Sequence, residues 1–351
     1  MLKSLYYKAL NNRRYIKPEQ EKSDTSFLEG KWFDKYFSYC ESDFSIAAGD
    51  GSFNKKKFLM FNYCPIGAEA LIFDGELKHI EQSEIFEKDH LPYLDELLST
   101  YMSIFEFKCC LKAINEYDVD YYLFDGSILG DLQNPYPMGS KFPEDIKKNL
   151  DGGVLSLFLE KINDLSDLGL SFPFLLDKVF KHASKDNIDD YNLHLSSIEK
   201  LLLLREILMK NKKIISISKT SSANDLFTSK APDIAIFDQY TQKEGMSKVI
   251  QKKVKLKSAF PVFDDFFKQL WFTIFYIRLE DNKNILKIEL PYKASNDEIM
   301  KVIGIIKRDL SEGYPYLLKK AHNDVIIKNK DVEDLLKIGR VYETTNREQL
   351  M

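Results

Sequence analysis

The sequence predicts a mixed α/β fold in which one sheet is flanked by helices and carries a helix-rich insertion at about 141–210. Two observations predict this class. Short apolar runs typical of strands alternate with stretches in which apolar residues recur every three or four positions. The 351 residues also contain no internal repeat and no low-complexity linker. This alternation favours a single α/β unit over separate all-α and all-β domains.

The first half of the chain alternates strand patterns with one long helix pattern. A charged, helical lead-in occupies residues 1–43, and a strand at Phe44–Ala48 follows it directly. Apolar runs within 56–73 predict antiparallel strands joined by short polar turns. Apolar residues then recur at helical spacing from Leu91 to Ile114, which predicts a long helix before a strand at Val119–Phe124.

The second half closes the insertion and returns to strands. An amphipathic helix is predicted at Ile198–Met209, and a strand at Lys213–Ser218. The apolar runs PDIAIF, PVFDDFF, LWFTIFYIRL and ILKIELP, which begin within 231–290, predict four locally paired strands. Ser295 is a suitable N-cap for a helix at Asn296–Leu310. A helix, a short strand and a final helix are expected to follow, with residues 331–351 forming the last helix and a tail.

Composition restricts the class of protein. Lys and Arg total 50 against 54 Asp and Glu, which excludes a uniformly basic coat for nucleic acid but not a lysine-lined channel. No apolar run is long enough to span a membrane, so we expect no membrane partner. The four cysteines form no CxxC pair, which is typical of inert thiols in a reduced, cytoplasmic protein: Cys40, Cys64, Cys109 and Cys110.

Two copies of one local pattern are the main candidates for chemistry. The segments IAAGDGSF at 46–53 and YLFDGSIL at 122–129 each run an apolar strand into Asp-Gly-Ser. If the two strands are neighbours, Asp50 and Asp125 face one another at the sheet edge and can hold Mg²⁺ or Mn²⁺, which prefer oxygen ligands. The alternative is a pair of ordinary β-turns, because Asp-Gly is a favoured turn dipeptide.

Three further polar residues could belong to such a site. Glu106 interrupts an apolar helix face, so it is either solvent-exposed or retained for a partner such as a metal. Lys219 ends its strand as the two aspartates end theirs and could neutralise a phosphate, although a plain surface lysine is the alternative. His322 could ligate the same metal or transfer a proton, or it could be structural.

Two lysine-rich segments are candidates for contacts with phosphate groups. Lys55, Lys56 and Lys57 follow the first Asp-Gly-Ser directly, and Lys252 and Lys253 lie in a second cluster. For the second cluster, a solvated hairpin explains the composition equally well.

The order of these motifs resembles the NurA nuclease family of archaea and some bacteria. The similarity rests on strand-DGS, a helical Glu, strand-DGS, strand-SKTS and the late segment GYPYLLKKAH, and it covers about 44–330. The resemblance implies an RNase H-like core and a 5′-to-3′ nuclease that acts on single- and double-stranded DNA, usually with Mn²⁺, Mg²⁺ being possible. It further implies a homodimer that works with the hexameric HerA ATPase in DNA end resection.

The resemblance also implies roles for particular residues. Carried over by motif, Asp50, Glu106 and Asp125 are acidic metal ligands and His322 completes the site. Tyr314 lines the site, and Lys219 lies in the third motif block. The third acid is the least anchored of these, with Glu116 as its alternative.

Two other functions fit the same residues. The first is an RNase H-like nuclease that acts on RNA or RNA–DNA hybrids. The second is a non-catalytic assembly subunit of a DNA translocase, in which the Asp-Gly-Ser turns are purely structural.

Overall fold

The computed structural model describes residues 3–11, 26–133, 144–150, 152–181, 188–255 and 260–341. The rest of the predicted lead-in, insertion and C-terminal tail lies outside the described residues. Most of the described strands join one mixed sheet, whose main path runs in the order β1-β8-β10-β11-β7-β6-β2-β4-β3. In addition, β5 pairs with β4, and β9 pairs with β10. The strands of this sheet are β1 (Trp32–Asp34), β2 (Ile46–Phe53), β3 (Lys56–Lys57), β4 (Asn62–Phe73), β5 (Leu77–Lys88), β6 (Tyr121–Asp125), β7 (Ile214–Ser218), β8 (Gly245–Ser247), β9 (Ile250–Lys253), β10 (Trp271–Arg278) and β11 (Leu286–Leu290).

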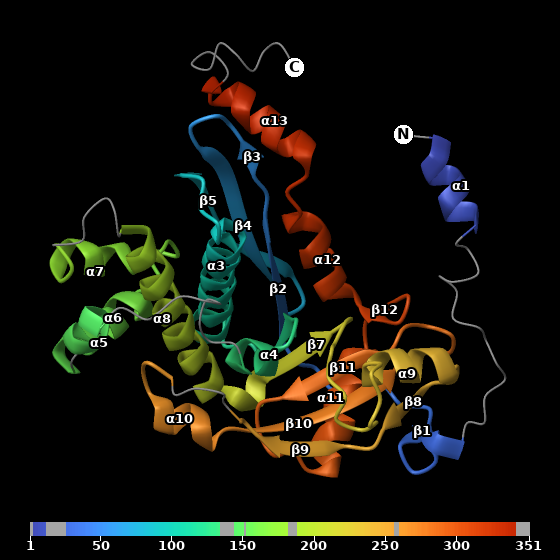
Figure 1. Cartoon of the computed structure of the whole chain (residues 1–351). Coiled ribbons are helices and arrows are strands. Elements are labelled where there is room, and N and C mark those ends of the chain that lie inside the picture. The colour runs from blue at the N-terminus through green and yellow to red at the C-terminus, as the bar shows by residue number, and fades with distance from the viewer. Residues whose placement is uncertain are drawn as a thin grey trace.

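Helices cover both faces of the sheet (Figure 1). One face packs on α3 and α8, and the other on α11 and α12. A small hairpin of β12 (Leu310–Ser311) and β13 (Tyr314–Pro315) precedes α12. The helices are α1 (Lys3–Asn11), α3 (Leu94–Glu116), α4 (Ile128–Gln133), α5 (Glu144–Asn149), α6 (Gly152–Asn163), α7 (Pro173–Lys178), α8 (Ile188–Met209), α9 (Asp233–Tyr240), α10 (Asp264–Gln269), α11 (Asn296–Lys307), α12 (Tyr316–Val325) and α13 (Asn329–Ile338), with 3-10 turns at Ser26–Leu28 and Asn211–Lys213.

A buried ion pair joins the helical insertion to α3. Lys108 Nζ lies 3.4 Å from Glu199 Oε1 of α8 and donates to Ser171 Oγ at 2.8 Å. Glu199 in turn accepts hydrogen bonds from the backbone N–H groups of Ser171 and Phe172. Both charged side chains are almost fully excluded from solvent. The loop before α7 is therefore fixed to the helix that also carries Glu106.

The mixed α/β class, the mixed sheet and the flanking helices are confirmed. The long helix becomes α3, and the strands predicted at Val119–Phe124 and Lys213–Ser218 become β6 and β7. Ser295 caps α11 as expected: its hydroxyl accepts from Glu298 N, and the Glu298 side chain accepts from Ser295 N. The RNase H-like assignment and the domain limits stay predictions.

Two predicted strands are helices instead. PDIAIF forms most of the first turns of α9, because Asp233 accepts the backbone N–H groups of Leu226 and Phe227 and so fixes the entry to a helix. PVFDDFF leads into α10, where Asp264 accepts from Phe260 N and the Phe260 ring stacks on Phe267. Short apolar runs fit a buried helix as well as a strand, and in both segments an aspartate in the first helical turn accepts backbone N–H groups of the preceding loop.

Other predictions differ at their boundaries. The strand predicted to stop at Ala48 continues through Asp-Gly-Ser to Phe53, because β4 pairs with it along its whole length. Residues 326–328 between α12 and α13 form no strand. The twelve-residue β5 and the β12–β13 hairpin were not predicted at all. Within the part of the chain that is described, no helix is long and apolar enough to cross a membrane.

The cysteines fit the expected inert thiols. All four cysteines lie in the part of the chain that the structure describes. None of them forms a disulfide, and three are buried. Burial raises the pKa of Cys64 to about 11 and that of Cys109 to about 12, so neither is a thiolate at neutral pH.

Candidate metal centre

Parallel pairing of β2 and β6 brings the two Asp-Gly-Ser segments together. The register pairs Gly49 with Phe124, and the next residue on each strand is Asp50 or Asp125. Neighbouring strands lie about 4.8 Å apart, so the two carboxylates are adjacent. The strand pairing stops there, because Gly126 has φ +119° and turns the chain away from β2. The Asp-Gly-Ser segment at Asp50 thus lies within a continuing strand, whereas the one at Asp125 lies at a strand end, as predicted.

His322 approaches Asp50 from α12. Its Nδ1 lies 2.6 Å from Asp50 Oδ2, while the backbone N–H of Gly51 donates to Asp50 Oδ1 at 2.8 Å. Burial raises the pKa of Asp50, the hydrogen bond from His322 opposes that rise, and the charge of Asp125 adds to it. The Asp50 carboxylate is thus held by two donors, His322 and the backbone of Gly51.

Glu106 reaches the same place from the opposite face of the sheet. A Cβ atom at Gly51 would lie 2.3 Å from Glu106 Oε1, so glycine at this position is what lets the carboxyl group approach β2. Burial raises the pKa of Glu106 well above its ordinary range, and the nearby charge of Asp50 raises it further. Glu116 lies ten residues, or about 15 Å, farther along the helix, where its partner is Lys112 at 3.8 Å. The structure thus favours Glu106 over Glu116 as the third acid.

Lys219 and Tyr314 border Asp125. Lys219 follows β7 directly, and its Nζ lies 3.2 Å from Asp125 Oδ2 and 4.3 Å from the centre of the Tyr314 ring. Tyr314 comes from β13 and is buried. Burial, and then the negative charge of Asp125, raises the pKa of Tyr314, which keeps its hydroxyl protonated. Five elements and the segment after β7 therefore bring together the six residues predicted from the sequence: Asp50, Glu106, Asp125, Lys219, Tyr314 and His322.

The donor set fits a divalent cation. Among the described residues, Asp50, Asp125 and His322 each offer a ligand atom, and these atoms lie within 4.8 Å of one another. Two carboxylates with one imidazole suit Mn²⁺, which accepts oxygen and nitrogen ligands in octahedral geometry. Glu106 does not join this group of three, although its charge interacts with both aspartates. Its position suits a second coordination layer or a second ion.

A buried polar network behind Asp125 was missed by the sequence analysis. Glu289 of β11 is fully buried and accepts from Ser127 Oγ at 2.7 Å, from Leu129 N at 3.1 Å and from Lys287 Nζ at 2.6 Å. Glu289 therefore fixes the turn that follows Asp125 through its hydrogen bonds to Ser127 and Leu129. The signal was present in the strand LKIEL, where two charged residues at alternate positions face the same side among apolar neighbours.

The predicted lysine contacts lie at opposite ends of the sheet. On β4, Lys56 pairs with Tyr63 and Asp50 pairs with Glu69. These two positions are six residues apart, so Lys56 lies about 20 Å from Asp50 along the strand, at 3.3 Å per residue. Lys56 and Lys57 are exposed, and Lys55 forms an ion pair with Asp95. Lys252 and Lys253 lie on β9, beyond β10. Neither group is part of the metal centre.

Comparison with known proteins identifies the relatives of this chain. The family model described as "NurA domain" matches residues 44–327. A curated protein of Methanocaldococcus jannaschii, "Probable DNA double-strand break repair nuclease NurA", is 31% identical, with 94% of this chain and 87% of that protein covered. "DNA double-strand break repair nuclease NurA" of Saccharolobus solfataricus is 25% identical, with 96% and 95% covered.

Solved structures share the fold. The NurA nuclease from Sulfolobus solfataricus matches with a TM-score of 0.75 at 20% identity, and 99% of each chain is covered. A structure described as NurA bound to dAMP and manganese matches with a TM-score of 0.66 at 18% identity, with 95% of this chain and 96% of that chain covered.

Proposed function

Because the chain belongs to the NurA family, we propose that it is a metal-dependent nuclease that hydrolyses phosphodiester bonds in DNA. The observation that carries this proposal is the convergence of Asp50, Asp125 and His322 from β2, β6 and α12. Relatives named DNA double-strand break repair nucleases support DNA as the substrate. A related structure with manganese supports Mn²⁺ as the cofactor, and Mg²⁺ has the same ligand preference.

The residues divide the chemistry of hydrolysis between them. Asp50, Asp125 and His322 would hold the cation, which supplies an acidified water and neutralises charge on the phosphate. Lys219, beside Asp125, places its ammonium where negative charge grows on the phosphoryl oxygens. Tyr314 orients Lys219 through its ring face. Glu106 lies close enough to interact with Asp50 and Asp125, and a bound cation would favour its ionised form.

The finer proposal concerns polarity and biological setting. We propose a 5′-to-3′ exonuclease and single-strand endonuclease activity that acts in DNA end resection with a HerA-type hexameric ATPase. Phosphates of the DNA backbone would contact basic side chains outside the metal centre. Among these are Lys55, Lys56 and Lys57, which lie at one end of the sheet. The predicted NurA nuclease domain at 44–330 agrees with the family-model match at 44–327 and stays a proposal as a structural unit.

Cleavage of linear DNA tests the function directly. Purified protein incubated with end-labelled linear duplex and single-stranded DNA should degrade both in Mn²⁺ and neither in EDTA, as seen on a denaturing gel. The same reaction with labelled RNA and an RNA–DNA hybrid should proceed at least about tenfold more slowly, because the relatives are DNA nucleases. Faster cleavage of RNA would favour the RNase H-like alternative. No cleavage of any substrate would favour a non-catalytic subunit.

An aromatic surface near the N-terminus is the proposed partner contact. Of the four aromatic residues Trp32, Phe33, Tyr36 and Phe37, Trp32 packs on Phe237 and Phe37 is buried, whereas Phe33 and Tyr36 are 51% and 70% exposed. Exposed aromatic side chains are enriched in protein interfaces. The variant Phe33→Glu/Tyr36→Glu should lower homodimer mass in light scattering or weaken binding to the HerA-type ATPase. If both measurements stay at wild-type values, this surface is not the contact.

A further inference from the structure

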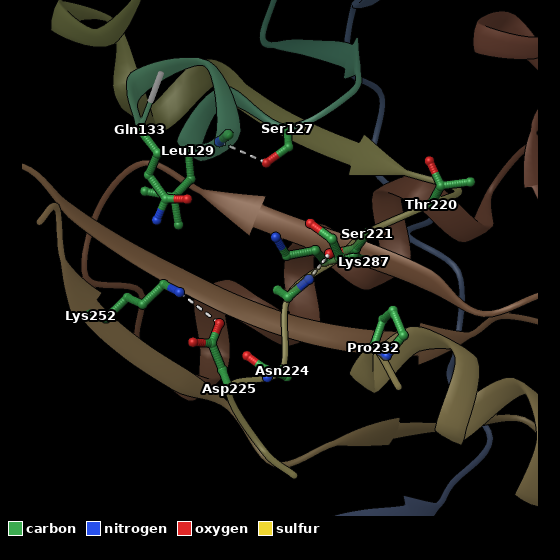
Figure 2. Close-up of a pocket in the computed structure, with 13 residues that line it drawn as sticks. Ser127, Leu129, Gln133, Thr220, Ser221, Asn224, Asp225, Pro232, Lys252 and Lys287 are labelled. Atoms are coloured by element: carbon green, nitrogen blue, oxygen red, sulfur yellow. Dashed lines mark hydrogen bonds and ion pairs between the residues drawn. The ribbon is translucent and has the colours of Figure 1, made fainter. Parts of the chain in front are cut away.

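A cavity of about 690 Å³ opens beside the candidate metal centre, and two of its lining residues follow residues of the centre closely in the chain. Ser127 follows Asp125 by two residues, and Thr220 follows Lys219 directly; both line the cavity. Figure 2 shows Ser127 and Thr220 on one side of this space and Lys252 on the other. A group bound at Asp125 could thus continue into the cavity without leaving the protein surface.

A buried cation lines the cavity. The Lys287 side chain is 5% exposed, and its ammonium donates to Glu289 Oε1 at 2.6 Å. An ammonium has three donors, and the described contacts of Lys287 use one of them. Glu289 also accepts from Ser127 and Leu129, so its charge is shared among several donors. Lys287 therefore retains donors for an anion that enters from the cavity.

The remaining wall is mainly neutral and polar. Hydroxyl groups come from Thr220, Ser221 and Ser222, and amide groups from Asn224 and Gln133. These groups can donate and accept at once, as sugar oxygens and the edges of bases require. Cavities that bind small molecules typically enclose about 300–1,000 Å³, so a volume of this size accommodates one nucleotide.

Two neighbouring lysines differ in how they relate to the cavity. Lys252 lines it, and its Nζ lies 2.6 Å from Asp225 Oδ2 at the wall. Lys253 is exposed and projects from the other face of β9, since side chains alternate along a strand. The two residues carry the same charge on the same strand, and only one of them faces the cavity.

We propose that this cavity is the subsite for the deoxynucleotide next to the scissile phosphate, in which Lys252 and Lys287 contact the neighbouring phosphate and the neutral groups contact sugar and base. The proposal rests on the proposed nuclease function, because it places the scissile phosphate at the metal centre. Asp225 holds Lys252 in position and also repels the incoming phosphate, so it limits the affinity of the subsite.

Binding of thymidine 3′,5′-bisphosphate tests the proposal, because this probe carries both phosphates and has no internucleotide bond to cleave. Calorimetry of the full-length chain in Mn²⁺ should give a Kd that rises about tenfold in Lys252→Ala, as expected for loss of one charge-assisted contact. The matched control Lys253→Ala should change Kd less than twofold. Asp225→Asn should tighten binding, which a folding defect would not do.

Several outcomes would overturn the subsite. Equal weakening by Lys252→Ala and Lys253→Ala would show a general charge effect, and absence of binding to wild type at millimolar probe would remove the subsite altogether. Because the readout is binding, it is separate from the nuclease test. Cleavage of DNA without bisphosphate binding rejects the subsite alone, whereas binding without any cleavage rejects the proposed nuclease.

Discussion

Asp125→Asn should reduce Mn²⁺-dependent cleavage of linear DNA by about a thousandfold or more. The substitution keeps the size of the side chain but removes one of the two negative charges that converge with His322. Metal ions contribute several kcal/mol to charge stabilisation in hydrolysis, and each 1.36 kcal/mol corresponds to a factor of ten in rate. The expected loss follows from poorer cation binding together with a free Lys219, whose ammonium no longer has its partner at 3.2 Å.

Metal binding can be measured apart from cleavage. In wild type, Mn²⁺ should raise the melting temperature, because the cation binds the folded state and relieves repulsion among the carboxylates. Asp125→Asn should lose most of this shift while keeping the wild-type circular dichroism spectrum. Asp95→Asn is the matched control, since Asp95 is an exposed aspartate on α3 whose partner is Lys55. Full activity of Asp125→Asn in Mn²⁺ would reject Asp125 as a metal ligand.

The candidate site could be predicted where a short motif fixed the position of a side chain. Asp50 and Asp125 were found because the same strand-DGS pattern occurs twice, and parallel pairing of β2 and β6 then places them side by side. His322 and Lys219 were also named, although their proximity depends on the packing of α12 and on the order of β6 and β7. Sequence spacing holds no information on such long-range packing.

Other features depend on tertiary contacts alone. The strand β5 alternates charged and apolar residues without a strong apolar run, and its pairing with β4 over twelve positions stabilises it. The apolar run PDIAIF lies in a helix, and the hydrogen bonds that Asp233 accepts from Leu226 N and Phe227 N fix the loop before it. The sequence does not predict Glu289 as a site residue, because its partners Ser127 and Leu129 lie about 160 residues away in the chain. Long-range polar networks of this kind need the structure.

The second large effect concerns stability: Lys108→Ala should lower the free energy of unfolding by about 3–5 kcal/mol, because it leaves the buried Glu199 without its cation. Lys108 is almost fully buried between α3, α8 and the loop before α7. Denaturant unfolding followed by circular dichroism measures the change. The matched control is Lys112→Ala, one turn farther along α3, whose partner Glu116 is about half-exposed. This pair is partly exposed and Lys112 also donates to Leu165 O at 3.2 Å, so the control should lose about 1–2 kcal/mol, less than Lys108→Ala.

The pH dependence separates loss of the ion pair from loss of packing. Burial raises the pKa of Glu199, and Lys108 is the largest influence that opposes this rise. Without Lys108, the folded-state pKa of Glu199 moves further above its unfolded value, so the native state binds more protons than the unfolded chain. The destabilisation of Lys108→Ala should therefore be greatest near neutral pH and shrink as the pH falls toward the unfolded pKa. Pairing Lys108→Met with Glu199→Gln removes both charges but keeps an acceptor for the backbone N–H groups of Ser171 and Phe172, so it should recover most of the loss at pH 7. A pH-independent loss that the double variant does not recover would mean that the insertion is fixed to α3 by apolar packing rather than by this ion pair.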